Sequence, residues 1–314
     1  MPAAGLPSAG SSRGTDMAMA ETQQRTGRGR AVNTTPLLAP SVVVLLLWML
    51  VPLGMTLWFS FQRYNLLNPF TRGFGGLENY QYLLEEPALW VAMGNTLVLV
   101  GSVLIVTVAL GTVLAVLFDQ EFFGRGIARV LAIAPFFVMP TVSALIWKNL
   151  LMHPVNGVFA FLAESLGFEA VDWFGEIPMA SVVMIVSWQW LPFALLILLT
   201  AIQSLDEEQK EAARMDGAGP LSMFAFIILP HLGRAISVVI MIETIFFLTI
   251  FAEIFVTTSG GPGLATTNLA YLIYIRALLE FDVGGASAGG VIAIILANIV
   301  AFFLIRAIAR TMDV

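Results

Sequence analysis

The chain has 314 residues, of which 58% are hydrophobic and 11% are charged. A typical soluble domain carries about a quarter charged residues. There is no cysteine, which excludes disulfides and thiolate metal sites, and the two histidines, His153 and His231, are far apart in the sequence, so we expect no metal site. A net charge of −6 argues against nucleic acid as a partner. The composition predicts an integral membrane protein.

Apolar stretches long enough to cross a bilayer, which takes roughly 20 residues, organise the rest of the chain. We expect residues 36–314 to form a transmembrane domain with spans at about 37–61, 89–118, 127–149, 178–203, 232–256 and 288–310. The first stretch is longer than the roughly 7–15-residue apolar core of a signal peptide, and no small-residue cleavage site interrupts it. The predicted fold class is all-α integral membrane, with six transmembrane helices.

The ends of the chain and its basic residues predict the orientation. Residues 1–35, rich in Ala, Gly, Ser and Thr with scattered Arg, are predicted to be a disordered cytoplasmic tail. With the N-terminus inside, 11 Lys and Arg residues fall on the inner side and 4 on the outer side, where the loops also carry nine carboxylates. Because inner loops are enriched in basic residues, we expect both termini to be cytoplasmic.

Prolines interrupt several of the predicted spans. Pro52, Pro135, Pro140 and Pro192 each remove a backbone donor and tend to kink a helix. Packing geometry explains any one of them, but four together, beside polar residues, favour helices that line a pathway.

The inner loop between the fourth and fifth spans has an internal order of its own. Asp206 is a good N-cap, with Glu207 and Glu208 in the first turn, where the helix dipole favours acids. Gly217 supplies the residue that ends this helix. Pro220 is placed to begin a second short helix, which we expect to stop around Pro230. The alternative is an ordinary interfacial loop.

This loop carries a motif with fixed offsets. Glu211-Ala212-Ala213 is followed after three residues by Gly217, and after nine more by Ile227-Ile228-Leu229-Pro230. The pattern resembles the EAA motif of the membrane subunits of binding-protein-dependent ABC importers. That resemblance implies a cytoplasmic coupling helix that enters a cleft on an ATPase. The coupling residues it implies are Glu211, Ala212, Ala213, Asp216, Gly217, Ile227, Leu229 and Pro230.

Further segments are similar to the carbohydrate, or maltose-type, branch of that family. The outer segment 257–288 contains Gly-Gly-Pro, then Thr and Tyr residues, and ends in the pattern Gly-x-Ala-Ser-Ala. Residues 134–149, 153–157 and 187–205 resemble those of sorbitol and mannitol permeases. The likeness covers roughly residues 36–314 and implies a neutral polyol or sugar as substrate.

The resemblance also implies partners and a location. It places the chain in the cytoplasmic (inner) membrane, in contact with lipid, as a multi-pass subunit paired with a second permease, an ATPase homodimer and a solute-binding protein. The sequence has no Gly-rich loop ending in Lys-Ser or Lys-Thr, so we expect no cofactor in this chain, with ATP and Mg bound by the partner ATPase. We expect a transport subunit and no enzymatic activity.

Polar residues near the middle of the spans are candidates for the substrate pathway, because burying them in lipid is costly. These candidates are Trp188, Gln189, Trp190, Glu243, Asn298 and Glu253. Glu243 is expected to be neutral or paired with a donor. Glu253 lies ten residues on, about 15 Å along one helix, where a solvated residue near the outer mouth is an equal reading. Packing roles remain the alternative for the tryptophans and for Asn298.

Two other classes of protein are weighed against an importer subunit. A secondary transporter would show inverted repeats or an ion relay, and the sequence shows no clear internal repeat. An intramembrane enzyme lacks support, since there is no HExxH motif and neither histidine falls within a span. Other ABC importer substrates, such as a disaccharide or glycerol phosphate, stay open. An anionic solute would favour a basic residue in the pathway, and none is buried in the predicted spans.

Overall fold

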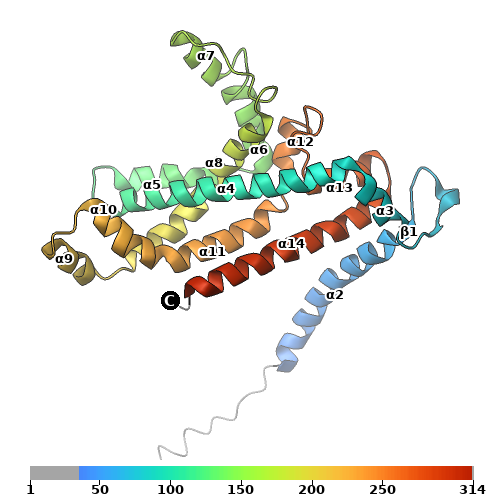
Figure 1. The fold of residues 1–314 in the computed structure, drawn as a ribbon, viewed down its shortest axis with the longest axis horizontal. Helices are drawn as coiled ribbons and strands as arrows, with labels where there is room; N and C mark the ends of the chain where they lie inside the picture. The colour runs from blue at the N-terminus through green and yellow to red at the C-terminus, as the bar shows by residue number, and fades with distance from the viewer. Residues whose placement is uncertain (1–34, 313–314) are drawn as a thin grey trace, which may run out of the picture. The chain divides into compact units, whose positions relative to one another are not determined.

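The computed structural model describes residues 35–312, and the chain divides into two compact units, Met1–Leu53 and Gly54–Val314 (Figure 1). Thr35 begins the first helix, α2 (Thr35–Ser60), so the predicted tail lies outside the described residues up to that point. In the first unit the side chains from Leu38 to Leu53 are all exposed. Such a surface suits a helix whose neighbours are lipid or other chains.

The second unit begins with the end of α2 and a small hairpin. Strands β1 (Gln62–Arg63) and β2 (Gly73–Phe74) pair antiparallel, with Gln62 opposite Phe74, and enclose the 3-10 turn η1 (Pro69–Thr71). Helix α3 (Glu78–Glu85) follows and leads into the long α4 (Pro87–Asp119).

The described residues contain five helices long and apolar enough to cross a membrane. They are Leu38–Ser60, Pro87–Asp119, Pro178–Gln203, Pro220–Phe247 and Val283–Arg306. A further pair, Arg125–Phe137 and Pro140–Leu151, passes the same test together but is bent by 107°. The prediction of six spans is confirmed when this bent pair counts as one.

Prolines account for the break in the third span. Helix α5 (Arg125–Ile133) runs into the 3-10 turn η2 (Ala134–Phe137), and α6 (Pro140–Ile146) then continues into the π-turn η3 (Trp147–Leu151). Pro135 and Pro140 remove backbone donors on either side of the extended Val138 and Met139. The prediction of one span over 127–149 is therefore corrected to a broken helix. Beyond it, α7 (Val158–Ser165) projects away from the layer of long helices (Figure 1).

Four long helices lie side by side and form the core: α4, α8 (Pro178–Gln203), α11 (Leu229–Phe247) and α14 (Val283–Met312) (Figure 1). Helix α4 packs most extensively on α8. At Gly111 an added Cβ would come within 3.0 Å of the Cβ of Ala194, so small residues permit this close approach.

The fifth span differs from its predicted bounds at both ends. Helix α10 (Pro220–Met223) and the π-turn η4 (Phe224–Ile228) run directly into α11, so the helix does not stop around Pro230. The wide π-turn just before Pro230 relieves the clash and missing donor that a proline brings. At the far end α11 stops at Phe247, and a separate helix, α12 (Ala252–Thr257), follows.

The last segment returns to the core. Helix α13 (Leu269–Tyr274) and its π-turn η5 (Ile275–Leu279) precede α14, which begins at Val283 rather than near residue 288. Arg276, the second residue of η5, forms ion pairs with Glu86, Glu280 and Asp282. These pairs tie the start of α14 to the start of α4.

Candidate functional site

Residues 206–230, named here the inner elbow after the side on which the sequence predicts them, begin with the predicted helix cap. The side chain of Asp206 accepts a hydrogen bond from the backbone N–H of Glu208 at 3.1 Å, and α9 (Glu207–Met215) follows. Glu207 and Glu208 lie in its first turn. An acid at this end satisfies a free N–H and complements the helix dipole. The predicted start of the helix is confirmed.

Gly217 ends α9 as predicted. Its φ of +83° is left-handed, a conformation that side-chain-bearing residues rarely adopt. The N–H of Ala218 donates to the carbonyl of Ala213 at 2.9 Å, the closing bond of a glycine C-cap. The bend between α9 and α10 is therefore specified locally, by one glycine followed by Pro220.

The surface of the inner elbow is open. Glu211, Ala212 and Asp216 are exposed, and Ala213 is half-buried. Apolar side chains stand out beside them: Met215 is 88% exposed, Leu221 84% and Phe226 80%. Ile227 is half-buried, whereas Leu229 and Pro230 are exposed. Leu221 and Phe226 fall in the candidate span Pro220–Phe247, where lipid can cover them, whereas Met215 lies on α9, outside every candidate span. A large apolar side chain exposed beside charged groups gives α9 the character of a docking surface.

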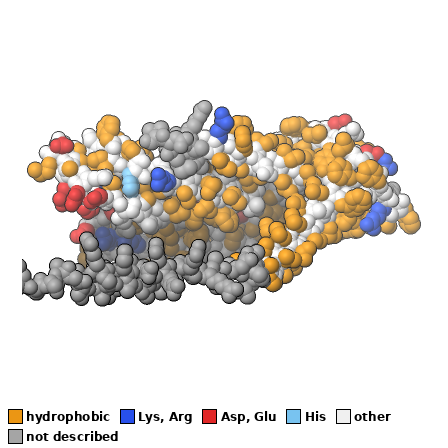
Figure 2. Space-filling view, turned by 90° about the horizontal axis from the view of Figure 1, so that it is seen from below, with side chains coloured by type: hydrophobic (Ala, Val, Ile, Leu, Met, Phe, Trp, Pro, Cys, Tyr) orange, Lys and Arg blue, Asp and Glu red, His pale blue; other side chains and the backbone are white. Residues whose placement is uncertain are grey.

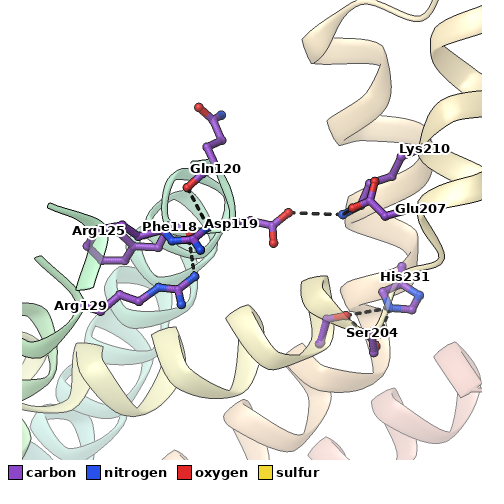
Figure 3. Close-up of polar contacts among 10 residues, drawn as sticks. Phe118, Asp119, Gln120, Arg125, Arg129, Ser204, Glu207, Lys210 and His231 are labelled. Atoms are coloured by element: carbon purple, nitrogen blue, oxygen red, sulfur yellow. Dashed lines mark hydrogen bonds and ion pairs between the residues drawn. The ribbon is translucent and has the colours of Figure 1, made fainter. Parts of the chain in front are cut away.

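Lys210 fixes the elbow to the end of α4 (Figure 3). Its ammonium lies 3.3 Å from a carboxylate oxygen of Asp119 and 2.9 Å from one of Glu207, and only 8% of its side chain is exposed. Burial by itself lowers the pKa of Lys210. The hydrogen bond to Glu207 and the neighbouring charge of Asp119 together outweigh it and raise the pKa above its ordinary value. Lys210 is not among the residues predicted from the sequence, although it directly precedes the Glu211-Ala212-Ala213 motif.

Other polar contacts connect helix ends near the inner elbow (Figure 3). Arg129 donates to the carbonyl of Phe118 at 2.6 Å. The ring nitrogen Nε2 of His231 lies 2.9 Å from the carbonyl oxygen of Ala201 and 3.2 Å from the hydroxyl of Ser204. Since these contacts join α5 to α4 and α11 to α8, the helix ends around the elbow are held together. Acidic side chains gather at this end of the surface (Figure 2).

Glu243 lies on α11, and its side chain is fully buried. One carboxyl oxygen accepts a hydrogen bond from the hydroxyl of Thr107 on α4 at 2.6 Å. The other, Oε1, is buried with no partner among the described residues. The expected donor is therefore found within the chain, and one acceptor is left over for a further group.

Gln189 forms a hydrogen bond to the backbone at the break in the third span. Its side-chain amide donates to the carbonyl of Val138 at 2.9 Å, at the extended residue between η2 and α6. Its own oxygen is buried without a partner in the described part of the chain. Since a broken helix leaves backbone groups unsatisfied, Gln189 supplies one of the missing partners.

The two tryptophans flanking Gln189 face different neighbours. Trp188 packs edge-on against Trp147, with ring centroids 5.6 Å apart. Trp190 lies among Phe136, Phe193, Phe246 and Phe247. The three consecutive candidates therefore do not converge on one point.

The remaining two candidates lie elsewhere. Asn298 is exposed, and its amide donates to the carbonyl of Ile294 on its own helix at 2.8 Å. Glu253 is 4% exposed and lies on α12, beyond the break after Phe247. The expectation of one continuous helix from Glu243 to Glu253 is wrong, and Glu253 is not a solvated residue.

A family model described as binding-protein-dependent transport system inner membrane component matches residues 27–314. The chain belongs to this family. It is 37% identical over 251 residues, covering 79% of this chain and 81% of the relative, to the probable ABC transporter permease protein y4oQ of Sinorhizobium fredii. It is 31% identical over 275 residues, covering 86% and 90%, to the trehalose/maltose transport system permease protein MalF of Thermococcus litoralis.

The fold agrees with this membership. A chain of a bacterial alginate ABC transporter, solved in complex with an alginate pentasaccharide-bound periplasmic protein, superposes with a TM-score of 0.72 at 20% identity, covering 92% of this chain and 94% of that one. As an inner membrane component of this family, the chain is a multi-pass integral membrane permease. The inner elbow and the buried Glu243 are therefore features of a permease.

Proposed function

We propose that this permease is one of two different membrane subunits of an ATP-driven importer, and that its inner elbow is the coupling helix. The observation that carries the proposal is the elbow itself. A capped helix and a glycine-defined bend present exposed Glu211, Ala212 and Met215 outside the candidate spans, where a partner can dock. Because Lys210 ties this surface to α4, a push on the elbow is transmitted to a core helix.

The proposed partners rest on two features, the absence of an ATP-binding loop from the sequence and the exposed surface of α2. The sequence contains no phosphate-cradling loop ending in Lys-Ser or Lys-Thr, so ATP and Mg are assigned to a separate ATPase homodimer. The exposed α2 surface suits a sister permease or lipid. A solute-binding protein would deliver substrate on the outer side. In this scheme ATP binding moves the elbow and switches the pathway from inward-facing to outward-facing, and hydrolysis resets it.

The substrate class is a neutral carbohydrate. No Lys or Arg is buried among the described side chains of α4, α8, α11 and α14, and an anionic solute would favour one. The Thermococcus relative named for trehalose and maltose supports a sugar. Within that class we propose a polyol such as sorbitol or mannitol, on the resemblance at residues 134–149, 153–157 and 187–205. A disaccharide or glycerol phosphate is the competing substrate.

Glu243 is the strongest candidate for contact with substrate in this chain. Its free carboxyl oxygen could accept a hydroxyl of a sugar. Asn298, exposed on α14, would reach substrate only beside the sister subunit. Gln189 and the tryptophans would shape the pathway by holding the broken third span in place.

Uptake of radiolabelled sorbitol tests the proposal, in cells that lack the gene and in cells in which it is restored. Unlabelled mannitol, maltose and glycerol phosphate serve as competitors, and ATP depletion as a further arm. A polyol importer is established if ATP-dependent uptake returns with the gene and only unlabelled mannitol competes with sorbitol. If maltose competes instead, the polyol assignment falls and the carbohydrate class stands. Uptake that persists after ATP depletion would contradict the importer.

A further inference from the structure

Two adjoining cavities follow the flank of α4. The first, of about 480 Å³, is apolar and lies between α4 and the helix formed by α10, η4 and α11. The second, of about 660 Å³, lies at the end of α4, against α5 and the inner elbow, and carries charged side chains. Phe224 lines both. The cavities therefore form one groove with an apolar end and a polar end, which is named here the α4 groove.

The charged groups at the polar end are not all paired with one another. Acids and bases are equal in number there: Asp119, Glu121, Glu207, Arg125, Lys210 and Arg214. Lys210, however, pairs with both Asp119 and Glu207. In the described part of the chain, neither Arg125 nor Arg214 forms an ion pair, and Arg125 donates only to the carbonyl of Gln120, at 3.3 Å. Arg125 and Arg214 therefore line the cavity without an ion-pair partner among the described residues, as does Glu121, although the six charges sum to zero.

The dimensions of the groove match one leaflet of a bilayer. Its apolar lining begins at Leu104 on α4, and its polar lining reaches Asp119. Fifteen residues of helix separate these positions, roughly 22 Å at 1.5 Å per residue. Half of a hydrocarbon core of about 30 Å, with the headgroup region beyond it, has a similar depth.

We infer that the α4 groove binds a glycerophospholipid of the inner leaflet. The phosphate lies between Arg125 and Arg214, because guanidinium groups bind phosphate through paired hydrogen bonds. An acyl chain fills the apolar part beside Ile105 and Ile240. The headgroup thus bridges α5 and α9, so the bound lipid contacts the inner elbow.

Retention of lipid by the purified importer complex tests this inference. Native mass spectrometry in detergent, with added dioleoyl phosphatidylglycerol or phosphatidylethanolamine, counts the phospholipids that stay bound. Arg125→Gln with Arg214→Gln is expected to weaken retention about tenfold, since charge-assisted hydrogen bonds to phosphate are lost. Arg234→Gln with Arg306→Gln is the control, because both arginines are exposed and lie outside the groove.

The apolar end has its own matched pair of variants. Ala109 lines the groove, whereas its neighbour Leu110 is 48% exposed and does not. Ala109→Trp is expected to displace the lipid and Leu110→Trp to leave it bound. Equal retention in both variants, or in both arginine pairs, would overturn the inference.

Two further arms distinguish the other occupants. A photo-crosslinking amino acid at Ile105, which is 71% exposed, is expected to attach to phospholipid in the assembled complex. Attachment to the sister permease instead would show a subunit interface and sink the lipid site. Inorganic phosphate is expected not to displace the lipid at millimolar concentration. If it does so as well as added phospholipid, the polar end is a site for free phosphate.

Discussion

The inner elbow and the buried polar residues of the core differ in how their geometry is specified. In the elbow, Asp206 caps α9 and Gly217 ends it, and both act on backbone groups within a few residues. In the core, Glu243 meets Thr107, which is 136 residues away, and Gln189 meets Val138, which is 51 residues away. The geometry of the elbow is therefore specified by neighbouring residues in the sequence. The contacts of Glu243 and Gln189 form only when distant segments pack together.

The largest effect is expected at the exposed part of the elbow. Ala212→Arg should abolish transport-coupled ATP hydrolysis, because a bulky charged side chain blocks close docking where a methyl group is exposed. Assembly with the ATPase and ATP hydrolysis by the purified complex are the measurements. Ala265→Arg is the control, since Ala265 is exposed and lies in a segment predicted to face outward, and should leave both unchanged. Normal transport by Ala212→Arg would refute the coupling assignment.

Sequence patterns located the spans and the start and bend of the elbow because apolar length and helix caps are local properties. They failed where an irregular turn or a tertiary partner decides. The helix continues through Pro230 because the π-turn before it accommodates the proline, and Glu253 is buried on a separate helix after the break at Phe247. The lysine that anchors the elbow was missed since Asp119 lies on another helix. Roles of the pathway candidates stay predictions.

A smaller effect, about a tenfold loss of uptake, is expected for Glu243→Leu, which removes the free acceptor along with the bond to Thr107. Co-purification with the sister permease should be unchanged. Thr107→Val separates the two roles, because it removes the interhelix bond and keeps the carboxyl group. If Thr107→Val loses as much uptake as Glu243→Leu, or if Glu243→Leu fails to assemble, Glu243 is structural and does not contact substrate.

Gln189→Leu probes the broken span. It leaves the carbonyl of Val138 without its side-chain donor, which should cost about 1–3 kcal/mol of stability. Thermal unfolding of the purified chain in detergent measures this. Gln203→Leu is the matched control, because Gln203 is exposed at the end of the same helix. Equal melting temperatures for the two variants would show that water or another group satisfies the carbonyl at the break.

The smallest effect is expected at Lys210, whose ion pair with Asp119 ties α9 to α4. Lys210→Gln should loosen α9 from α4 by about 1 kcal/mol, as for a part-exposed ion pair, and Lys210→Arg should restore the contact. The raised pKa gives a pH test. Because the folded pKa lies above the unfolded value of 10.5, the contact is at full strength below that pH and weakens as pH rises through the folded pKa.

The chain has no cysteine, so a spin label on Glu211→Cys reports elbow mobility at a single site. In the wild-type background the label should stay immobile from neutral pH to about pH 10 and become mobile only above that range. With Lys210→Gln it should be mobile throughout. Since Asp206 and Gly217 are untouched by either change, α9 itself should remain helical, and only its attachment to α4 should be lost. Unfolding of α9 in Lys210→Gln would instead mean that the tertiary contact, and not the local caps, specifies the elbow.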